Sequence, residues 1–480
     1  MLAWAAAPLA LMQGAGLVGQ QVAPISRQEA QQGAQYHPQF VAQFGGAMSG
    51  RQAQYVEQVG KKIALQSGLA NAESAFTVTL LNSPVHNAFA VPGGYVYTTR
   101  QLVTLMNNEA ELAGVMGHEV GHVAARHSQR RQQAATRNTL LGLGGAILSS
   151  VLLGNSAGGD LLSRGLLQGS QMLTLRFSRK QELEADDLGI AYLSRAGYDP
   201  RAMSTVLASL AAQNALDARL AGRNATVPEW ASTHPDPASR VRTAATKAQN
   251  FSGSALNRDT FLTGIDGLLY GDDPAQGVIE GSRFTHPEMM LSFTAPQGFI
   301  MANSPQAVSV QGQGGQAQLT MAAYNGNLET YVRAAFAAVG GQNSQLAPQS
   351  LERTTINGLP AAIGTARVNS NNGQVDVTVV AYEFARDRAY HFAAITPAGR
   401  AAVFNPMFNS MRRITQAEAS AVVPRRIQVV TVGRGDSVAS LARRMDYTTA
   451  QVERFRVLNA LGANEEVVPG QRVKIVVRGL

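Results

Sequence analysis

The stretch GHEVGHVAARH, residues 117–127, constrains the fold of this 480-residue chain more than any other. His118 and His122 are four residues apart, so on an α-helix their side chains lie one above the other on one face. That spacing lets two imidazole nitrogens reach one metal ion. Glu119 lies about 100° around the same helix, where it can reach a water molecule at the metal without binding the metal itself. We therefore predict a hydrolytic metal site rather than a helix that is merely rich in histidine.

A third ligand following the metzincin pattern is excluded. That pattern needs a histidine six residues after His122 with a glycine midway, but Ser128 and Ala125 occupy these positions. His127 is one residue out of register. We expect His127 to lie on the helix surface or to support a ligand.

A carboxylate on a later helix is the alternative source of the third ligand. Residues 177–189 read FSRKQELEADDLG, in which Glu182 and Asp186 are four apart and share a helix face. One of them can bind the metal while the other accepts the free ring N–H of a ligand histidine. Glu184 faces roughly the opposite side of that helix and is the competing ligand.

Composition narrows the chemistry further. The chain contains no cysteine, which excludes disulfides, thiolate ligands and cysteine nucleophiles, so a metal must be bound by His, Asp or Glu. The formal net charge is +8, but the basic residues are mostly arginines that do not alternate with aromatic residues in blocks. We therefore expect no nucleic-acid binding.

The remaining pattern predicts several helices and strands. Capping boxes predict that helices start at Ser26 and Ser178. Asn108 and Glu111 have the same spacing and predict the start of the helix that carries the histidines. No proline interrupts that helix until well beyond His127. The expected elements and connections are helices over 52–66, from 178 to near Gly197 and from Pro200 onward, a strand over 76–83, a strand–turn–strand over 86–99, and a connector over 251–280.

The stretches GHEVGHVAARH and SRKQELEADDLG resemble the gluzincin peptidases that include HtpX, the CAAX prenyl endopeptidases and the BepA-type periplasmic proteases. The resemblance covers roughly residues 26–250. It implies one Zn²⁺ bound by His118, His122 and Glu182, with Asp186 supporting a ligand histidine. Glu119 then takes the proton of the attacking water and passes it to the leaving amine.

Two more stretches match this family. NAFAVPGG, starting at residue 87, resembles the edge strand beside the zinc, which binds an extended peptide by main-chain pairing. STHPDPASR resembles the family's loop with a histidine and a later arginine. This implies that His234 lies near the metal, where it can cap the zinc and keep the enzyme latent, and that Arg240 stabilises the tetrahedral oxyanion. The implied substrate-binding residues are Asn87, Ala88, Phe89 and Ala90.

The C-terminal part has a different texture. Residues 281–415 are richer in Phe, Val and Thr and contain one amphipathic helix over 328–340. They faintly resemble a PsbP-like sandwich. We expect His286 and His391 in this region to be structural residues. Residues 428–476 resemble a LysM module in the order strand, helix, helix, strand. That resemblance implies binding of N-acetylglucosamine polymers such as peptidoglycan.

Two apolar segments bear on where in the cell the protein resides. The run MLAWAAAPLALM at the start resembles the core of a secretory signal, although no positive charge precedes it. The apolar run over 139–154 is short for a membrane span, and it could touch a membrane surface or simply be buried. The chain lacks the several long apolar spans of the membrane-embedded members of the family. We therefore expect a protein of the periplasm or cell envelope.

The sequence thus predicts an α+β multidomain protein, with a mainly helical gluzincin domain containing a small β-sheet, an α+β sandwich-like domain and a small LysM-like domain. We expect a zinc endopeptidase that cleaves unfolded or misassembled envelope proteins. The rivals are a wall-anchored, chaperone-like protein with a latent peptidase site and a peptidoglycan-processing hydrolase. The predicted divisions are 1–24 (signal), 25–250 (peptidase), 251–280 (connector), 281–415 (α+β), 416–427 (linker) and 428–476 (LysM-like).

Overall fold

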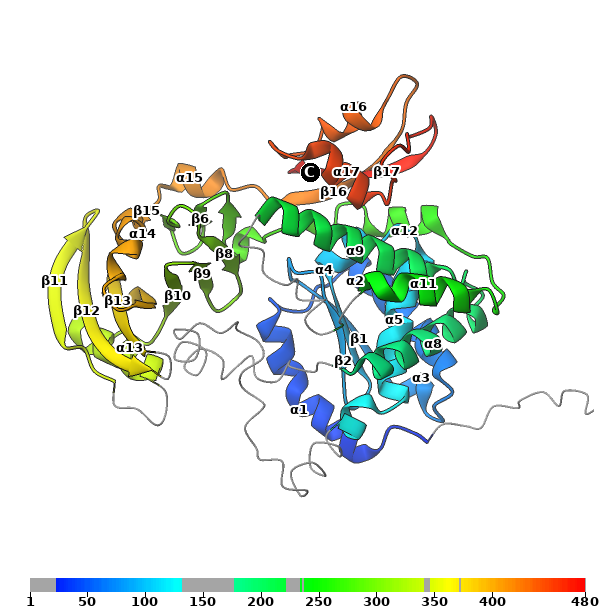
Figure 1. Ribbon diagram of the computed structural model, residues 1–480, viewed down its shortest axis with the longest axis horizontal. Helices are drawn as coiled ribbons and strands as arrows, with labels where there is room; N and C mark the ends of the chain where they lie inside the picture. The colour runs from blue at the N-terminus through cyan, green and yellow to red at the C-terminus, as the bar shows by residue number, and fades with distance from the viewer. Residues whose placement is uncertain are drawn as a thin grey trace, which may run out of the picture.

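The computed structural model describes residues 23–131, 177–221, 234, 237–340, 346–370 and 373–479. This part of the chain forms a mixed α/β multidomain protein, with a helical body around a small sheet, a unit of two sheets, and a C-terminal unit (Figure 1). All of the predicted signal except residues 23 and 24, and the whole apolar run 139–154, lie outside the described residues. Within the described ranges, no helix combines the length and apolar character needed to cross a membrane.

The small sheet follows the predicted strand–turn–strand pattern. Its order is β1 (Thr77–Leu81), β3 (Tyr95–Thr99), β2 (Ala88–Val91), so β2 is an edge strand of the sheet formed by the described residues. Gly93 and Gly94 form the turn with φ of 94° and 83°, a region open to glycine at little cost. A Cβ on Gly94 would lie 2.1 Å from the carbonyl oxygen of Ala75, so this turn requires glycine.

Helices cover both faces of this sheet, because alternate strand residues point to opposite faces. On one face, α1 (Arg27–Gln43) packs Phe40 against Phe89 and Tyr97. On the other face, Ala88 and Ala90 join the main core together with α2 (Arg51–Ala64) and α5 (Glu109–Ala124). The Ser26 capping box of α1 is formed as predicted.

Helix α5 packs closely against α8 (Arg179–Arg195), and α9 (Ala202–Ala221) and α11 (Pro237–Ala248) pack against this pair (Figure 1). A Cβ on Gly117 would lie 3.1 Å from Cα of Gly189, and one on Gly121 would lie 3.2 Å from the Ala185 carbonyl oxygen. Glycines at these two positions therefore allow the close approach of the helices.

Two predictions for these helices are wrong in detail. The metal-site helix ends at Ala124, because Arg126 adopts a left-handed conformation with φ of 53° and turns the chain. Pro200 lies in a turn rather than at the first helical position, since the Asp199 carbonyl oxygen accepts from Ala202 N and delays the start of α9 to Ala202. Other short helices of this region include α3 (Ala72–Ala75) and α4 (Arg100–Leu105).

The segment 251–280 is more ordered than the connector that its Gly, Asn and Asp content predicts. It forms α12 (Arg258–Ile265), β4 (Leu269–Tyr270) and β5 (Val278–Glu280). Phe261, Leu262 and Ile265 of α12 are buried in the main core. This segment is therefore part of the packing around the metal-site helix.

Residues 281–415 form antiparallel strands in two sheets with the predicted helix α13 (Leu328–Gly340) packed on one of them. His286 and His391 are both buried here, and His391 Nδ1 lies 3.0 Å from the Tyr331 hydroxyl. One sheet has the order β15 (Arg412–Arg413), β7 (Leu291–Thr294), β6 (Arg283–His286), β5. The other has the order β11 (Ser350–Ile356), β12 (Leu359–Ser370), β13 (Gly373–Ala385), β14 (Arg388–Pro397), β10 (Gly315–Met321), β9 (Val308–Gly312), β8 (Ile300–Asn303).

The C-terminal unit has the expected order of strand, helix, helix, strand. Its elements are β16 (Arg425–Thr431), α16 (Val438–Ala442), α17 (Gln451–Leu458) and β17 (Arg472–Arg478). Strand β4 pairs with β16, so the sheet has the order β17-β16-β4. Ile427 and Ile475 belong to the same hydrophobic core as the metal-site helix. The unit is therefore packed onto the helical body rather than hanging from it on a linker.

Candidate metal centre

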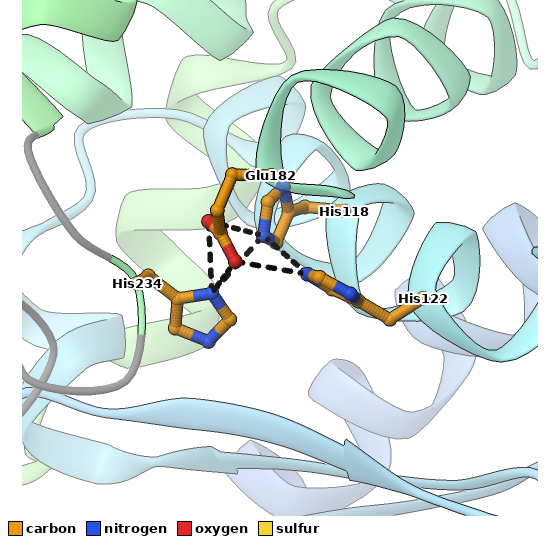
Figure 2. A group of neighbouring side chains, drawn as sticks. All are labelled: His118, His122, Glu182 and His234. Carbon is orange, nitrogen blue, oxygen red and sulfur yellow. Dashed lines mark hydrogen bonds and ion pairs between the residues drawn. The ribbon is translucent and has the colours of Figure 1, made fainter. Parts of the chain in front are cut away.

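Four side chains converge in the helical body (Figure 2). His118 and His122 come from α5, Glu182 comes from α8, and His234 lies just before α11. Each offers one ligand atom, and these atoms all lie within 4.8 Å of one another. All four residues are buried, which is costly for such polar groups unless they are paired or bind a cation.

The geometry of the two histidines fits a shared ligand. His118 Nε2 and His122 Nε2 lie 3.0 Å apart, as the four-residue spacing on α5 predicts. The helix is anchored at its start by the Asn108 side chain, which accepts from Glu111 N at 2.9 Å. The Glu111 carboxylate accepts from Asn107 N instead of closing the box on Asn108.

Glu182, not Glu184, joins this group. The Glu182 oxygens lie 3.5 Å from His118 Nε2 and 3.5 Å from His122 Nε2. Glu184 pairs with Arg130 at 3.0 Å on the outer side of α8. The Ser178 capping box, formed as predicted, fixes the first turn of α8 that presents Glu182.

Asp186 and Arg240 form hydrogen bonds to members of this group. Asp186 Oδ1 lies 2.9 Å from His118 Nδ1, the contact expected of a carboxylate that orients a ligand histidine. Arg240 donates to Asp186 Oδ2 and Oδ1 at 2.8 and 2.6 Å, and to Glu182 Oε2 at 2.7 Å. Each guanidinium nitrogen is thus engaged by a carboxylate. The role at the oxyanion implied by the family resemblance does not follow from this geometry, which makes Arg240 a clamp on two carboxylates.

The charges of these groups depend on one another. Burial opposes protonation of His118, but Asp186 and Glu182 outweigh it and raise the pKa of His118 to about 9. Burial raises the pKa of Asp186, but Arg240 and His118 outweigh it and lower this pKa to about 2. Burial keeps the pKa of His122 well below its usual value. The neutral imidazole of His122 is the form that binds metal ions.

The buried carboxylate of Glu119 is the strongest indication that the group binds a ligand. Its side chain is 0% exposed, and within the described part of the chain neither carboxylate oxygen has a hydrogen-bond partner. His234 Nε2 lies 3.5 Å from Glu119 Oε1. Burial raises the pKa of Glu119. A buried carboxylate without such a partner is costly, so its position beside the four donors fits a bound cation and water.

His234 completes the donor set. Its Nδ1 lies 3.1 and 3.2 Å from the two Glu182 oxygens and 3.2 Å from His118 Nε2. A set of three imidazoles and one carboxylate suits a borderline metal such as zinc.

The predicted substrate strand also lies near the site. Residues 87–90 run into edge strand β2, which packs against α5. Asn87, Ala88, Phe89 and Ala90 are all buried.

Sequence reasoning missed Phe177. Its ring stacks on His122 with centroids 3.9 Å apart and an interplanar angle of 23°. The only signal was an aromatic residue directly before the Ser178 capping box.

Comparisons with known proteins place this site in a family context. Residues 50–248 match the family model of Peptidase family M48. The beta-barrel assembly-enhancing protease of Escherichia coli (strain K12) is 36% identical over 197 residues, covering 41% of this chain and 38% of that protein. The Yersinia pestis protein of the same name is 35% identical over 229 residues, covering 46% and 44%. The mitochondrial metalloendopeptidase OMA1 of Schizosaccharomyces pombe is 34% identical over 191 residues, covering 39% and 50%.

The chain thus spans half or less of the length of these curated relatives. The matched region contains all four residues of the donor group and Glu119. Together, the match of residues 50–248 to Peptidase family M48 and the metalloendopeptidase names among its relatives support a metalloendopeptidase, with a buried group that could hold its metal ion.

Proposed function

We propose that this protein is a zinc-dependent endopeptidase of the cell envelope that cleaves unfolded or misassembled proteins. The observation that carries the proposal is the buried donor group of His118, His122, Glu182 and His234 beside the carboxylate of Glu119. The proposal of misassembled proteins as substrates is supported by the similarity to beta-barrel assembly-enhancing proteases, whose names link those relatives to the assembly of β-barrels.

The division of labour follows from the contacts. His118, His122 and Glu182 would hold the zinc ion, which when bound polarises a carbonyl and makes water more acidic. Glu119 accepts the proton of the attacking water and passes it to the leaving amine. Asp186 fixes the ring of His118, and Arg240 holds both Asp186 and Glu182 in place.

The substrate would bind along β2. Among the described residues β2 pairs with β3 on one side, so an extended peptide could pair with its other side, while the main-chain groups of Asn87 already pair with Thr99. Main-chain pairing depends little on the side chains of the substrate. It requires an extended backbone, which an unfolded segment readily provides. Asn87, Ala88, Phe89 and Ala90 are therefore the proposed substrate-binding residues.

Glu119→Gln tests the chemistry. The variant should keep zinc and lose casein cleavage by at least about 100-fold, because an amide cannot accept the proton of water. Metal analysis and casein digestion of both proteins give the comparison. Cleavage by the variant near the rate of the wild type, or insensitivity of the wild type to phenanthroline, would rule out the proposed mechanism.

His234 is proposed as a latch. A catalytic zinc site needs an open position for water, and the His234 ring lies where it could fill that position. Displacing the ring would then activate the enzyme, and the free-energy difference between the two arrangements sets the degree of latency. His234→Ala should cleave casein faster than the wild type at equal zinc occupancy. A slower variant would instead assign His234 to catalysis.

The C-terminal unit is proposed to bind peptidoglycan, as its LysM-like sequence implies. Since this unit shares its core with the peptidase region, the intact protein is the right sample. Wild-type protein should sediment with purified peptidoglycan, while release of soluble fragments from the glycan would favour the rival peptidoglycan hydrolase. Failure to sediment would leave the unit with a structural role alone.

A further inference from the structure

The chain turns sharply directly after the helix that carries His118 and His122. Arg126 has φ of 53°, a left-handed conformation that non-glycine residues rarely adopt. Its guanidinium donates to the carbonyl oxygens of Ala23 and Pro24 at 3.0 Å each. It also donates to Glu29 Oε1 at 3.3 Å. Such a conformation persists only when its surroundings fix it, and residues of this kind concentrate at functional sites.

The turn places His127 against a proposed ligand. On an uninterrupted helix, His127 would lie about 140° around the axis from His122. Instead, His127 Nδ1 lies 2.8 Å from His122 Nδ1, and the rings meet edge to face at 75°. The His127 side chain is 0% exposed. Its carbonyl oxygen accepts from Gln181 Nε2 at 3.1 Å, which ties the turn to the first turn of α8.

The direction of the hydrogen bond follows from chemistry. His122 turns Nε2 toward the donor group, so a metal-binding His122 carries its ring proton on Nδ1 and donates it to His127. His127 then accepts at Nδ1 and carries its own proton on Nε2. That nitrogen lies 3.3 Å from Glu184 Oε2. The contact between His122 and His127 is a hydrogen bond, whereas the contact between His127 Nε2 and Glu184 is close in distance without being aligned as one.

We propose that His127 is a positioning residue, which together with Glu184 fixes the ring orientation and tautomer of His122. This inference rests on the proposed metal site. It gives Glu184, which is not placed to bind the metal, a role of its own. Each proposed ligand histidine then has a carboxylate behind it: Asp186 directly behind His118, and Glu184 through one imidazole behind His122. Outer contacts of this kind raise ligand basicity and hold the ring in place.

A matched pair of variants at the protein surface tests the proposal. Glu184→Ala and Arg130→Ala both remove the Arg130–Glu184 ion pair, but only Glu184→Ala removes the carboxylate that lies 3.3 Å from His127 Nε2. Glu184→Ala should weaken zinc binding about 10- to 100-fold, measured by competition with a chromophoric chelator. Arg130→Ala should bind zinc like the wild type. Equal affinities for the two variants would overturn the role of Glu184 and, with it, the proposed series.

A second set of variants tests His127 itself. His127→Asn keeps an acceptor near the position of Nδ1, whereas His127→Phe keeps a ring without one. His127→Phe should lose zinc affinity about 10- to 100-fold and change the absorption spectrum of the Co²⁺-loaded protein, and His127→Asn should restore most of both. His391→Phe, at another buried histidine, is the control and should change neither.

The outcomes separate the two hypotheses. If the wild type binds no zinc or Co²⁺, the proposed function fails. If the wild type binds metal and His127→Phe matches it in affinity and spectrum, only the role of His127 fails. Should His127→Phe not fold, the comparison of Glu184→Ala with Arg130→Ala decides.

Discussion

At the scale of single residues, the site is an arrangement of buried charges that balance one another. Arg240 is the cation that permits two carboxylates, Asp186 and Glu182, to remain charged in the interior. Removing one member of such a group leaves a buried charge without its partner, which costs about 3–5 kcal/mol. The clamp therefore matters for folding as well as for metal binding.

The lowered pKa of Asp186 predicts loss of stability in acid for the metal-free protein. Its folded pKa of about 2 lies below the ordinary 3.8, so its contribution is present above pH 4 and disappears as the pH falls toward 2. A shift of this size corresponds to about 2 kcal/mol, of which about 1 kcal/mol should be lost by pH 3.

Urea unfolding at pH 7 and pH 3 measures this loss. The stability difference between the wild type and Asp186→Asn should shrink by about 1 kcal/mol between the two pH values. Asp187→Asn is the control, because the neighbouring Asp187 lies partly exposed beside Lys247. A difference for Asp186→Asn that stays constant with pH would contradict the expected protonation.

At the scale of elements, the site depends on how closely α5 and α8 approach. His118 and His122 lie on one helix and Glu182 on the other, and Gly117 and Gly121 let the two backbones meet. The glycines of the histidine motif thus set the distance from the histidines to the carboxylate.

Gly121→Ala should separate the two helices. The new methyl group would lie 3.2 Å from the Ala185 carbonyl oxygen and Leu188 Cβ, so α8 would have to move and take Glu182 with it. We expect a stability loss of about 1–3 kcal/mol and weaker zinc binding.

Gly114→Ala on the same helix is the control for that effect. Its new methyl group would meet no atom closer than 3.6 Å, an ordinary contact. Higher helix propensity should stabilise this variant by up to about 1 kcal/mol. Thermal unfolding and zinc titration of both variants give the comparison, and equal behaviour would contradict the proposed role of close packing.

At this scale, features that depend on residues within one helix could be predicted from the sequence, and features that depend on distant residues could not. The Ser26 and Ser178 capping boxes and the four-residue histidine spacing could be predicted because each is a local pattern within one helix. The turn at Arg126 could not, because contacts from residues about 100 positions away hold it. The helix α12 could not be predicted either, because its apolar residues are buried in a core that distant parts of the chain form.

At the scale of the whole molecule, the C-terminal unit supports the metal-site helix. The side chain of Lys474 in β17 is completely buried and donates to the carbonyl oxygens of Thr104 at 2.7 Å and Met106 at 2.5 Å, at the end of α4. Burial lowers the pKa of Lys474 to about 7, and Glu111, in the first turn of α5, opposes this shift. A unit expected to be an anchor is thereby built into the peptidase body.

Lys474→Met should destabilise the peptidase region itself. The change leaves two buried carbonyl groups without a donor, at a cost of about 1–3 kcal/mol for each group. Lys180→Met, at an exposed position of α8, should have little effect. Thermal release of zinc reports on the peptidase region, and an unchanged release midpoint in Lys474→Met would show that the two parts unfold independently.

The bond from Lys474 to Thr104 spans 370 positions of the chain. At about 5–20 residues per second, a ribosome needs roughly 20 to 70 s to make that intervening sequence. Throughout that interval, the region around Glu111 waits for its cation. The buried contact that joins the C-terminal unit to the end of α4 can therefore form only after nearly the whole chain has been made.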